Sequence, residues 1–378
     1  MSVMSAIEPT SYPWLDYRKY AFALGRKTPA GLFLSGATGS EHIDGAVVTR
    51  GGMAAQARLA WAKIAAVLEA EGKSLQDVTR VAEYVPIAAL EQYGEAIGVR
   101  TEILGGREIC VNTVPVKGLL RPDALIEIEA NTDIAAAGIS KGVVHLPTIL
   151  PLKNGEICYP GDVVGQTARI FEVAEEMLLA MGLDLSHVVQ TIDYLLPSVR
   201  RDYRGAGQPR FDALGPVYPG AAGIMQPGLL HPDAVVQYDI TATRDVPERI
   251  RVPGWDRYDS LSYSAGVKAG KLVFGSGFGA LNCATGECFH DYDIVAQADM
   301  IYASIQTMLA VAGAKMSDVV HTLEFVESQT LEAYKGVADV RRKYFGSQVL
   351  PAATGVVCEG ILKRSFVIEI VPIAVISE

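Results

Sequence analysis

Residues 56–72 read QARLAWAKIAAVLEAEG, residues 166–182 read QTARIFEVAEEMLLAMG, and residues 297–313 read QADMIYASIQTMLAVAG. The three segments align without gaps at offsets of 110 and 131 residues. In each, apolar or small residues recur at i, i+3, i+4, i+7, i+10 and i+11, which predicts one buried face of an amphipathic helix. Each segment ends at a glycine suited to a left-handed C-cap. The chain is therefore predicted to contain one structural unit three times.

The repeat continues beyond these helices. Each glycine is followed by a turn, a β-rich run, and a second helix in which a tyrosine and an arginine stand seven residues apart. Each unit closes on a segment with the alternation of a half-buried strand, at 124–129, 234–239 and 366–370. We therefore predict an α+β fold of three tandem domains, at 1–135, 136–247 and 248–378.

Length, composition and charge describe a globular protein. The chain has 378 residues, of which 49% are hydrophobic and 20% charged, and its net charge is −10. Because no basic run could follow a phosphate backbone, no nucleic-acid partner is expected. The N-terminal stretch lacks an apolar signal segment, and the apolar runs elsewhere look too short to cross a bilayer. We expect a cytoplasmic protein with no membrane partner.

Particular residues of the repeat resemble a known family. Residues 263–277 read YSAGVKAGKLVFGSG, and residues 366–370 read FVIEI. The first copy repeats the Ser-Gly at 35–36 and has IEIE at 126–129. In these residues the chain resembles the RidA (YjgF/YER057c/UK114) family over nearly its whole length. Family members are about a third as long and form homotrimers, so the resemblance implies three RidA-like (chorismate mutase-like) domains packed as a single-chain pseudotrimer.

The resemblance also implies an activity. Characterised members hydrolyse enamines and imines such as 2-aminoacrylate to a keto acid and ammonia, without a metal or organic cofactor, and related proteins deaminate 2-aminomuconate in aromatic degradation. We therefore expect a hydrolase that acts on a small-molecule carboxylate substrate in clefts between domains. The family's water-positioning glutamate falls on Glu127 and Glu369. The second copy has Gln237, which cannot accept a proton, so its cleft is expected to be weak or inactive.

The family's carboxylate-binding arginine is missing from all three copies. Its positions are occupied by Val111, Ala221 and Ala353. Possible replacements are Arg100, Arg210 and Arg341, which share one register of the second helix. A repeated salt bridge is the alternative role for these arginines, and Arg107 is another candidate anchor.

Three further residues match the family's pocket. Tyr263 and Ser276 match its tyrosine and the serine of its Ser-Gly turn, and Ser35 matches that serine in the first copy. The alternative is that the serines end strands and the tyrosine is a packed aromatic. The pattern Cys283-x4-Cys288-x-His290 has no second ligand pair, so no metal is expected.

Two other functions stay open. The clefts could bind a ligand without turnover, or serve a chaperone-like role. A ring-opening amidohydrolase is suggested by the threefold pseudosymmetry of the cyanuric acid hydrolase and barbiturase group, which uses repeated Ser-Lys pairs. Lys63, however, aligns with Val173 and Ser304, so no lysine recurs. Association of pseudotrimers into a homo-oligomer is also left open.

Overall fold

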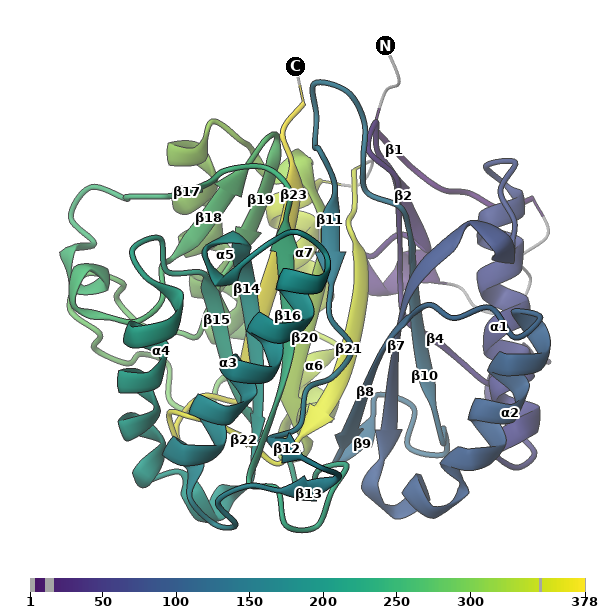
Figure 1. Ribbon diagram of the computed structural model, residues 1–378. Coiled ribbons are helices and arrows are strands. Elements are labelled where there is room, and N and C mark those ends of the chain that lie inside the picture. The colour runs from purple at the N-terminus through teal and green to yellow at the C-terminus, as the bar shows by residue number, and fades with distance from the viewer. Residues whose placement is uncertain (1–3, 11–16, 347–348, 378) are drawn as a thin grey trace.

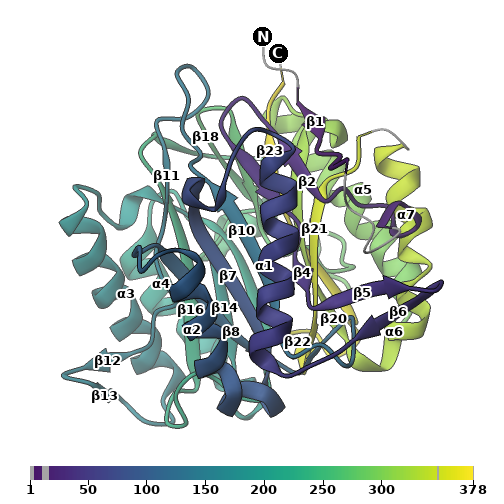
Figure 2. The same cartoon turned by 90° about the vertical axis from the view of Figure 1, so that its right-hand side faces the viewer.

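The computed structural model describes residues 4–10, 17–346 and 349–377. Three mixed sheets turn one face toward one another in the interior, and the long helices lie outside them (Figure 1, Figure 2). The N- and C-terminal ends lie at the same end of the molecule (Figure 1). The predicted α+β class and the threefold repeat are confirmed.

The first sheet has the order β1-β2-β3-β10-β7-β8, with β4 also paired to β10. Its strands are β1 (Ser5–Ala6), β2 (Gly25–Lys27), β3 (Leu32–Leu34), β4 (Ala37–Thr38), β7 (Val78–Pro86), β8 (Cys110–Val116) and β10 (Glu127–Thr132). Its helices are α1 (Met53–Glu69) and α2 (Tyr93–Ile103). A separate hairpin consists of β5 (Ser40–Ile43) and β6 (Ala46–Thr49).

The second sheet is built from β11 (Val143–His145), β16 (Val236–Thr243), β14 (Val188–Leu195) and β15 (Gly220–Met225), in that order. Its helices are α3 (Val163–Ala180) and α4 (Gly207–Leu214). A short hairpin pairs β12 (Leu152–Lys153) with β13 (Glu156–Ile157).

The third sheet is built from β17 (Pro247–Arg249), β18 (Gly266–Ala269), β19 (Leu272–Gly275), β23 (Ile368–Val375), β20 (Val319–Glu327) and β21 (Ala352–Cys358), in that order. Its helices are α5 (Ile294–Ala312), α6 (Leu331–Tyr334) and α7 (Val337–Phe345).

Two short strands cross between domains. β9 (Gly118–Leu119) extends the third sheet by pairing with β21, and β22 (Gly360–Ile361) extends the second sheet by pairing with β15. Apart from these two, the strands of the three sheets fall within 5–132, 143–243 and 247–375. On this membership we propose the three-domain division given above, with β17 starting one residue before the second boundary.

A glutamine near the start of each repeated helix holds the closing strand of its domain in place. Its side chain is buried and its Oε1 accepts a backbone N–H two residues before the family's glutamate position. The three bonds are Gln56 to Leu125 at 2.8 Å, Gln166 to Val235 at 2.8 Å, and Gln297 to Val367 at 2.9 Å. The predicted apolar face is buried as well, since Ala57, Ala60, Trp61, Ile64, Val67 and Leu68 are all in the core.

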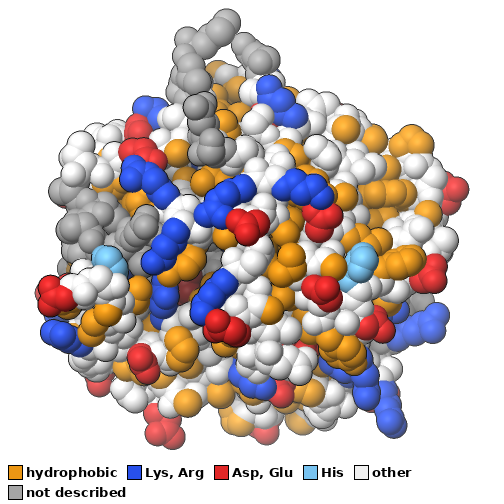
Figure 3. All heavy atoms as spheres, turned by 180° about the vertical axis from the view of Figure 1, so that it is seen from behind, with side chains coloured by type: hydrophobic (Ala, Val, Ile, Leu, Met, Phe, Trp, Pro, Cys, Tyr) orange, Lys and Arg blue, Asp and Glu red, His pale blue; other side chains and the backbone are white. Residues whose placement is uncertain are grey.

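Helix α5 corrects one expectation, because it is long and apolar enough to cross a membrane by length and composition. Its Ile301, Tyr302 and Ile305 are instead buried against the third sheet and α7, as in the core helix of a domain. On the face seen in Figure 3, basic and acidic side chains are interspersed. Cellular location and partners stay predictions.

Candidate active site

A cavity of about 200 Å³ lies between the first and third domains. The first domain contributes Tyr20, Phe22, Thr38, Leu120, Arg121 and Glu127, and the third contributes Leu331, Tyr334, Lys335, Ala338, Arg341 and Gly355. It is bounded by the closing strand of one domain and by the second helix of the next, which is where the family resemblance places a cleft.

The two predicted serines each form a clasp, which is a pair of backbone hydrogen bonds that joins two domains. Ser35 Oγ donates to the carbonyl of Ala23 at 2.6 Å and accepts from the N–H of Ala353 at 2.8 Å, between the first and third domains. Ser276 repeats the clasp with Ser264 at 2.5 Å and with Ala221 at 2.9 Å, between the third and second domains. Both serines are buried. Both hydroxyls are thus bonded to backbone groups, and a role in substrate binding stays a prediction.

Glu127 is the titratable group at the base of the cavity. Alternation along β10 turns Ile128 toward the helices and Glu127 and Glu129 toward the interior. Burial, followed by the charge of Glu129, raises the pKa of Glu127 to about 8, against the attraction of Arg121 and Lys63. The carboxyl group lies directly beside Gly36, where any side chain would collide with it. At neutral pH this carboxyl is therefore mostly protonated.

Lys63 supplies a positive charge behind the cavity wall. It projects from α1, and its Nζ donates to the carbonyl of Thr38 at 2.8 Å and to that of Ser40. Burial lowers its pKa to about 8. Because the other two copies have Val173 and Ser304 at this position, the charge belongs to the first domain alone.

The other two closing strands present different environments. Burial, with the charge of Asp193, raises the pKa of Glu369 to about 8, and its carboxyl lies beside Gly277 in the same way. Gln237 is fully buried, and its amide donates to the carbonyl of Thr113 at 3.2 Å and accepts from the N–H of Leu230 at 3.0 Å. Both ends of the Gln237 amide are thus bonded to backbone, as suits a cleft without chemistry.

The three repeated arginines are held by carboxylates of their own domains. Arg341 Nη2 donates to Glu324 at 2.5 Å and to the hydroxyl of Tyr334 at 2.6 Å. Arg100 and Arg210 form the same arrangement with an acid and a tyrosine, and the acids are Glu83 and Asp193. Each guanidinium is thus paired with a carboxylate, as in the alternative of a repeated salt bridge, and the role as a substrate anchor stays a prediction. The matching offsets of Glu83, Asp193 and Glu324 could have revealed this in the sequence.

Two more candidates lie elsewhere. Tyr263 packs edge-on against Tyr258 at the margin of the third domain's core, and its hydroxyl is 3.5 Å from Arg257. It does not line the cavity beside Glu127, and its role in a cleft stays a prediction. Arg107 donates to the carbonyls of Leu75 and Val78 and therefore braces a turn.

Arg121 is the cavity residue that the sequence reasoning missed. Its guanidinium carbon lies 5.2 Å from the ring centre of Tyr20. The signal was present in the repeat, because Arg121, His231 and Lys363 each stand six residues before the glutamate position. Basic residues at one register of a repeat indicate a shared surface, but they do not tell which of them faces a cavity.

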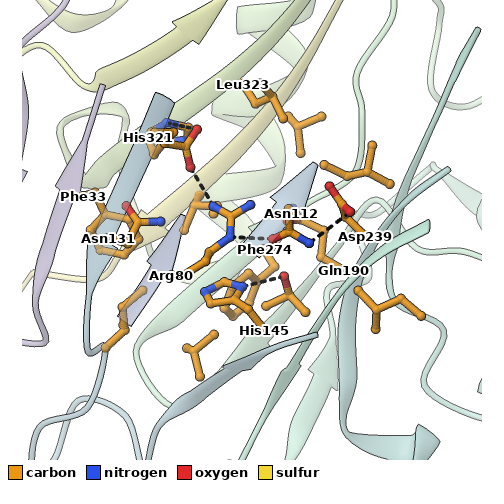
Figure 4. A pocket seen from close by; sticks show the side chains of 18 of the residues that line it. Phe33, Arg80, Asn112, Asn131, His145, Gln190, Asp239, Phe274, His321 and Leu323 are labelled. Carbon is orange, nitrogen blue, oxygen red and sulfur yellow. Dashed lines mark hydrogen bonds and ion pairs between the residues drawn. The ribbon is translucent and has the colours of Figure 1, made fainter. Parts of the chain in front are cut away.

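A second, smaller cavity lies on the axis where the three sheets meet (Figure 4). Arg80 donates to Glu129 at 2.7 Å and to Asn112 at 3.0 Å, while Glu129 lies 3.2 Å from His321. Asn112 continues the network to Asp239 at 3.0 Å. Burial opposes the charge of Glu129, but His321 and Arg80 outweigh it and hold its pKa well below the usual value. This network joins the three domains through charged side chains.

The raised pKa of Glu127 makes a prediction about stability. In the folded protein this pKa is about 8, against 4.5 for a glutamate that is not buried, so the stability is highest below pH 4.5 and falls as the pH rises to 8. Glu127→Gln should therefore raise the Tm by several degrees at pH 9 and leave it unaltered at pH 4, as measured by differential scanning calorimetry. Glu91→Gln, at an exposed position, is the control. A lower Tm at pH 9 for Glu127→Gln would contradict the assignment.

Comparison with known proteins agrees with this fold. A structure of a chorismatase is similar at a TM-score of 0.53 and 15% identity, over 79% of this chain and 93% of that one. Rv2704 of Mycobacterium tuberculosis, of the YjgF/YER057c/UK114 family, is 24% identical over 34% of this chain and 99% of its own, with a TM-score of 0.29. Escherichia coli TdcF, solved with bound serine, is 25% identical over 30% of this chain and 88% of its own, with a TM-score of 0.27.

The domains therefore define a fused protein of RidA type, with clefts between sheet-bearing units. The model of the endoribonuclease L-PSP family matches residues 19–134 and 258–376, which is more than half of the chain. The chain belongs to this family, and the resemblance to the RidA (YjgF/YER057c/UK114) group is confirmed. The matched regions are the first and third copies, and the middle copy, which carries Gln237, lies outside them.

Proposed function

We propose that the protein is a cofactor-independent hydrolytic deaminase of an enamine or imine acid, and that the cleft of Glu127 is its principal active site. One observation carries the proposal: a buried carboxyl group with a pKa near neutrality lies at the base of a cavity that also contains a cation. General acid and base catalysis needs a group that both gives and takes a proton near the working pH.

Glu127 can perform both halves of the reaction. In its protonated form it gives its proton to the β-carbon of the enamine, and an iminium ion results. The carboxylate then takes a proton from water as the water oxygen bonds to the iminium carbon. Glu127 next protonates the amino group, ammonia leaves, and the hydroxyl proton returns to the carboxylate as the keto group forms. The sum is enamine plus water giving keto acid plus ammonia.

Glu369 is proposed as a second, weaker site. Its carboxyl group is buried and has a raised pKa like that of Glu127, but the charges acting on it do not include a cation. A substrate carboxylate would gain less attraction there, and the developing charge on the substrate would be less well balanced. Activity at 2-aminomuconate rather than 2-aminoacrylate also stays a proposal, which the cavity size favours.

The assay measures ammonia released from freshly generated 2-aminoacrylate and from 2-aminomuconate, each against its decay without enzyme. We expect acceleration of at least one, with the larger effect on the larger acid. Spontaneous rates for both would overturn the deaminase proposal. Because a largely apolar cavity lined by basic side chains also suits a non-catalytic binding protein, binding without turnover would then favour that second function.

A further inference from the structure

Arg121 is distinguished from the other cations around the Glu127 cavity by its lack of a carboxylate partner. Arg341 is paired with Glu324, and Lys335 with Glu332 at 2.8 Å. No Asp or Glu among the residues 4–10, 17–346 and 349–377 forms an ion pair with Arg121. Its contact with the ring of Tyr20 fixes the guanidinium without neutralising it. A half-buried cation of this kind gains most from an anionic ligand.

Glu127 does not repel an anionic ligand at neutral pH. Its carboxyl group is mostly uncharged there, because its pKa is about 8. Of the other cations, Arg341 and Lys335 line the cavity but are paired with carboxylates, and Lys63 adds a positive charge from behind the wall. A carboxylate beside Arg121 is therefore attracted by its surroundings, and the attraction weakens once Glu127 ionises.

Part of the cavity wall is apolar. Phe22 and Leu120 of the first domain face Leu331 and Ala338 of the third. A volume of about 200 Å³ holds on the order of ten water-sized groups, since each needs roughly 10–15 Å³ by this measure. A three-carbon acid leaves much of that space empty, whereas a body of benzoate size covers the apolar surface.

We propose that Arg121 replaces the missing family arginine as the carboxylate anchor, and that the cavity takes acids with an apolar or conjugated body of benzoate size. As a statement about the substrate, this rests on the proposed function. As a statement about binding, it stands on the cavity alone. It explains how the positions of Val111, Ala221 and Ala353 could lose their arginine while one cleft kept a cation.

Binding of benzoate tests the inference without requiring catalysis. Isothermal titration calorimetry at pH 7 should show benzoate binding to the full chain, with acetate and benzamide binding more weakly. Arg121→Met should raise the Kd about 10- to 100-fold, because a hydrogen bond to a charged group contributes about 1.5–3 kcal/mol. Arg121→Lys should recover part of the loss. Lys363→Met, at the equivalent exposed position of the third copy, is the matched control and should bind like the wild type.

The pH dependence adds a second readout. Benzoate should bind more weakly at pH 9.5 than at pH 7, because ionised Glu127 repels it. Glu127→Gln should remove most of that difference while it keeps binding at pH 7. If Arg121 had only a structural role, benzoate binding would not show this pH dependence.

The outcomes separate the two proposals. Equal benzoate affinity in Arg121→Met and the wild type, or no binding to the wild type, would overturn the anchor. Acetate binding as tightly as benzoate would overturn the proposal that the ligand has an apolar body of benzoate size. If benzoate binding depends on Arg121 but no enamine is hydrolysed, the deaminase proposal fails and the anchor stands. If enamines are hydrolysed equally well by Arg121→Met, the anchor fails and the deaminase proposal stands.

Discussion

Glu127→Gln should lower the rate of ammonia release by about 10²- to 10⁴-fold, the usual contribution of a general acid or base. Glutamine has the shape of glutamate and can occupy this site, as Gln237 does at the equivalent position. It cannot exchange protons with water or with the substrate. The substitution therefore tests the proton transfer while it preserves the cavity.

The measurement compares kcat and KM for Glu127→Gln, Glu369→Gln and the double variant on the better substrate. The ammonia-release rate that remains in Glu127→Gln measures the contribution of the Glu369 cleft. The double variant should release ammonia at the uncatalysed rate. In the wild type, kcat/KM should decline above about pH 8, because the reaction begins with protonated Glu127. A wild-type rate in Glu127→Gln would refute the proposed mechanism.

Arg80→Met should destabilise the protein by about 3–5 kcal/mol, the usual cost of breaking a buried ion pair by removing one partner. Glu129 would keep His321 but lose Arg80, and Asn112 would lose a donor. Because these groups join the first domain to the other two, the effect should extend to domain association.

Urea unfolding followed by circular dichroism measures this loss, with Arg58→Met on the exposed outer face of α1 as the control. Arg58 pairs with Glu102 at an exposed site, where such pairs contribute about 1 kcal/mol or less. Arg80→Met combined with Glu129→Gln should be less destabilising than the sum of the single changes, since the buried charge is removed with its partner. Equal losses for Arg80→Met and Arg58→Met would contradict a structural role for the network.

The helix periodicity of 56–72 and its two repeats identified the buried faces correctly, because burial of one helix face follows from local spacing. The same register placed Glu127, Gln237 and Glu369 at equivalent positions of their strands. The register could not tell which arginine is left to bind a ligand, because both positions carry basic residues in all three copies. Arg100 recurs as an arginine, and Arg121 recurs as a histidine and a lysine. The two positions differ in whether a carboxylate accepts a hydrogen bond from the basic group, as Glu83 does from Arg100.

Sequence by itself determined the α+β class, the threefold unit and the family, since each depends on patterns that repeat along one chain. Only the tertiary structure decided that Ser35 bonds to Ala353, that Arg341 is paired with Glu324, and that Arg121 faces a cavity with no carboxylate partner among the described residues. These contacts join residues that are far apart in the chain, and most of them cross a domain boundary. The circular order in which the domains pack, and hence the composition of each cleft, is set by the pairing of β9 with β21 and of β22 with β15, because hydrogen bonds between strand edges fix which domain meets which.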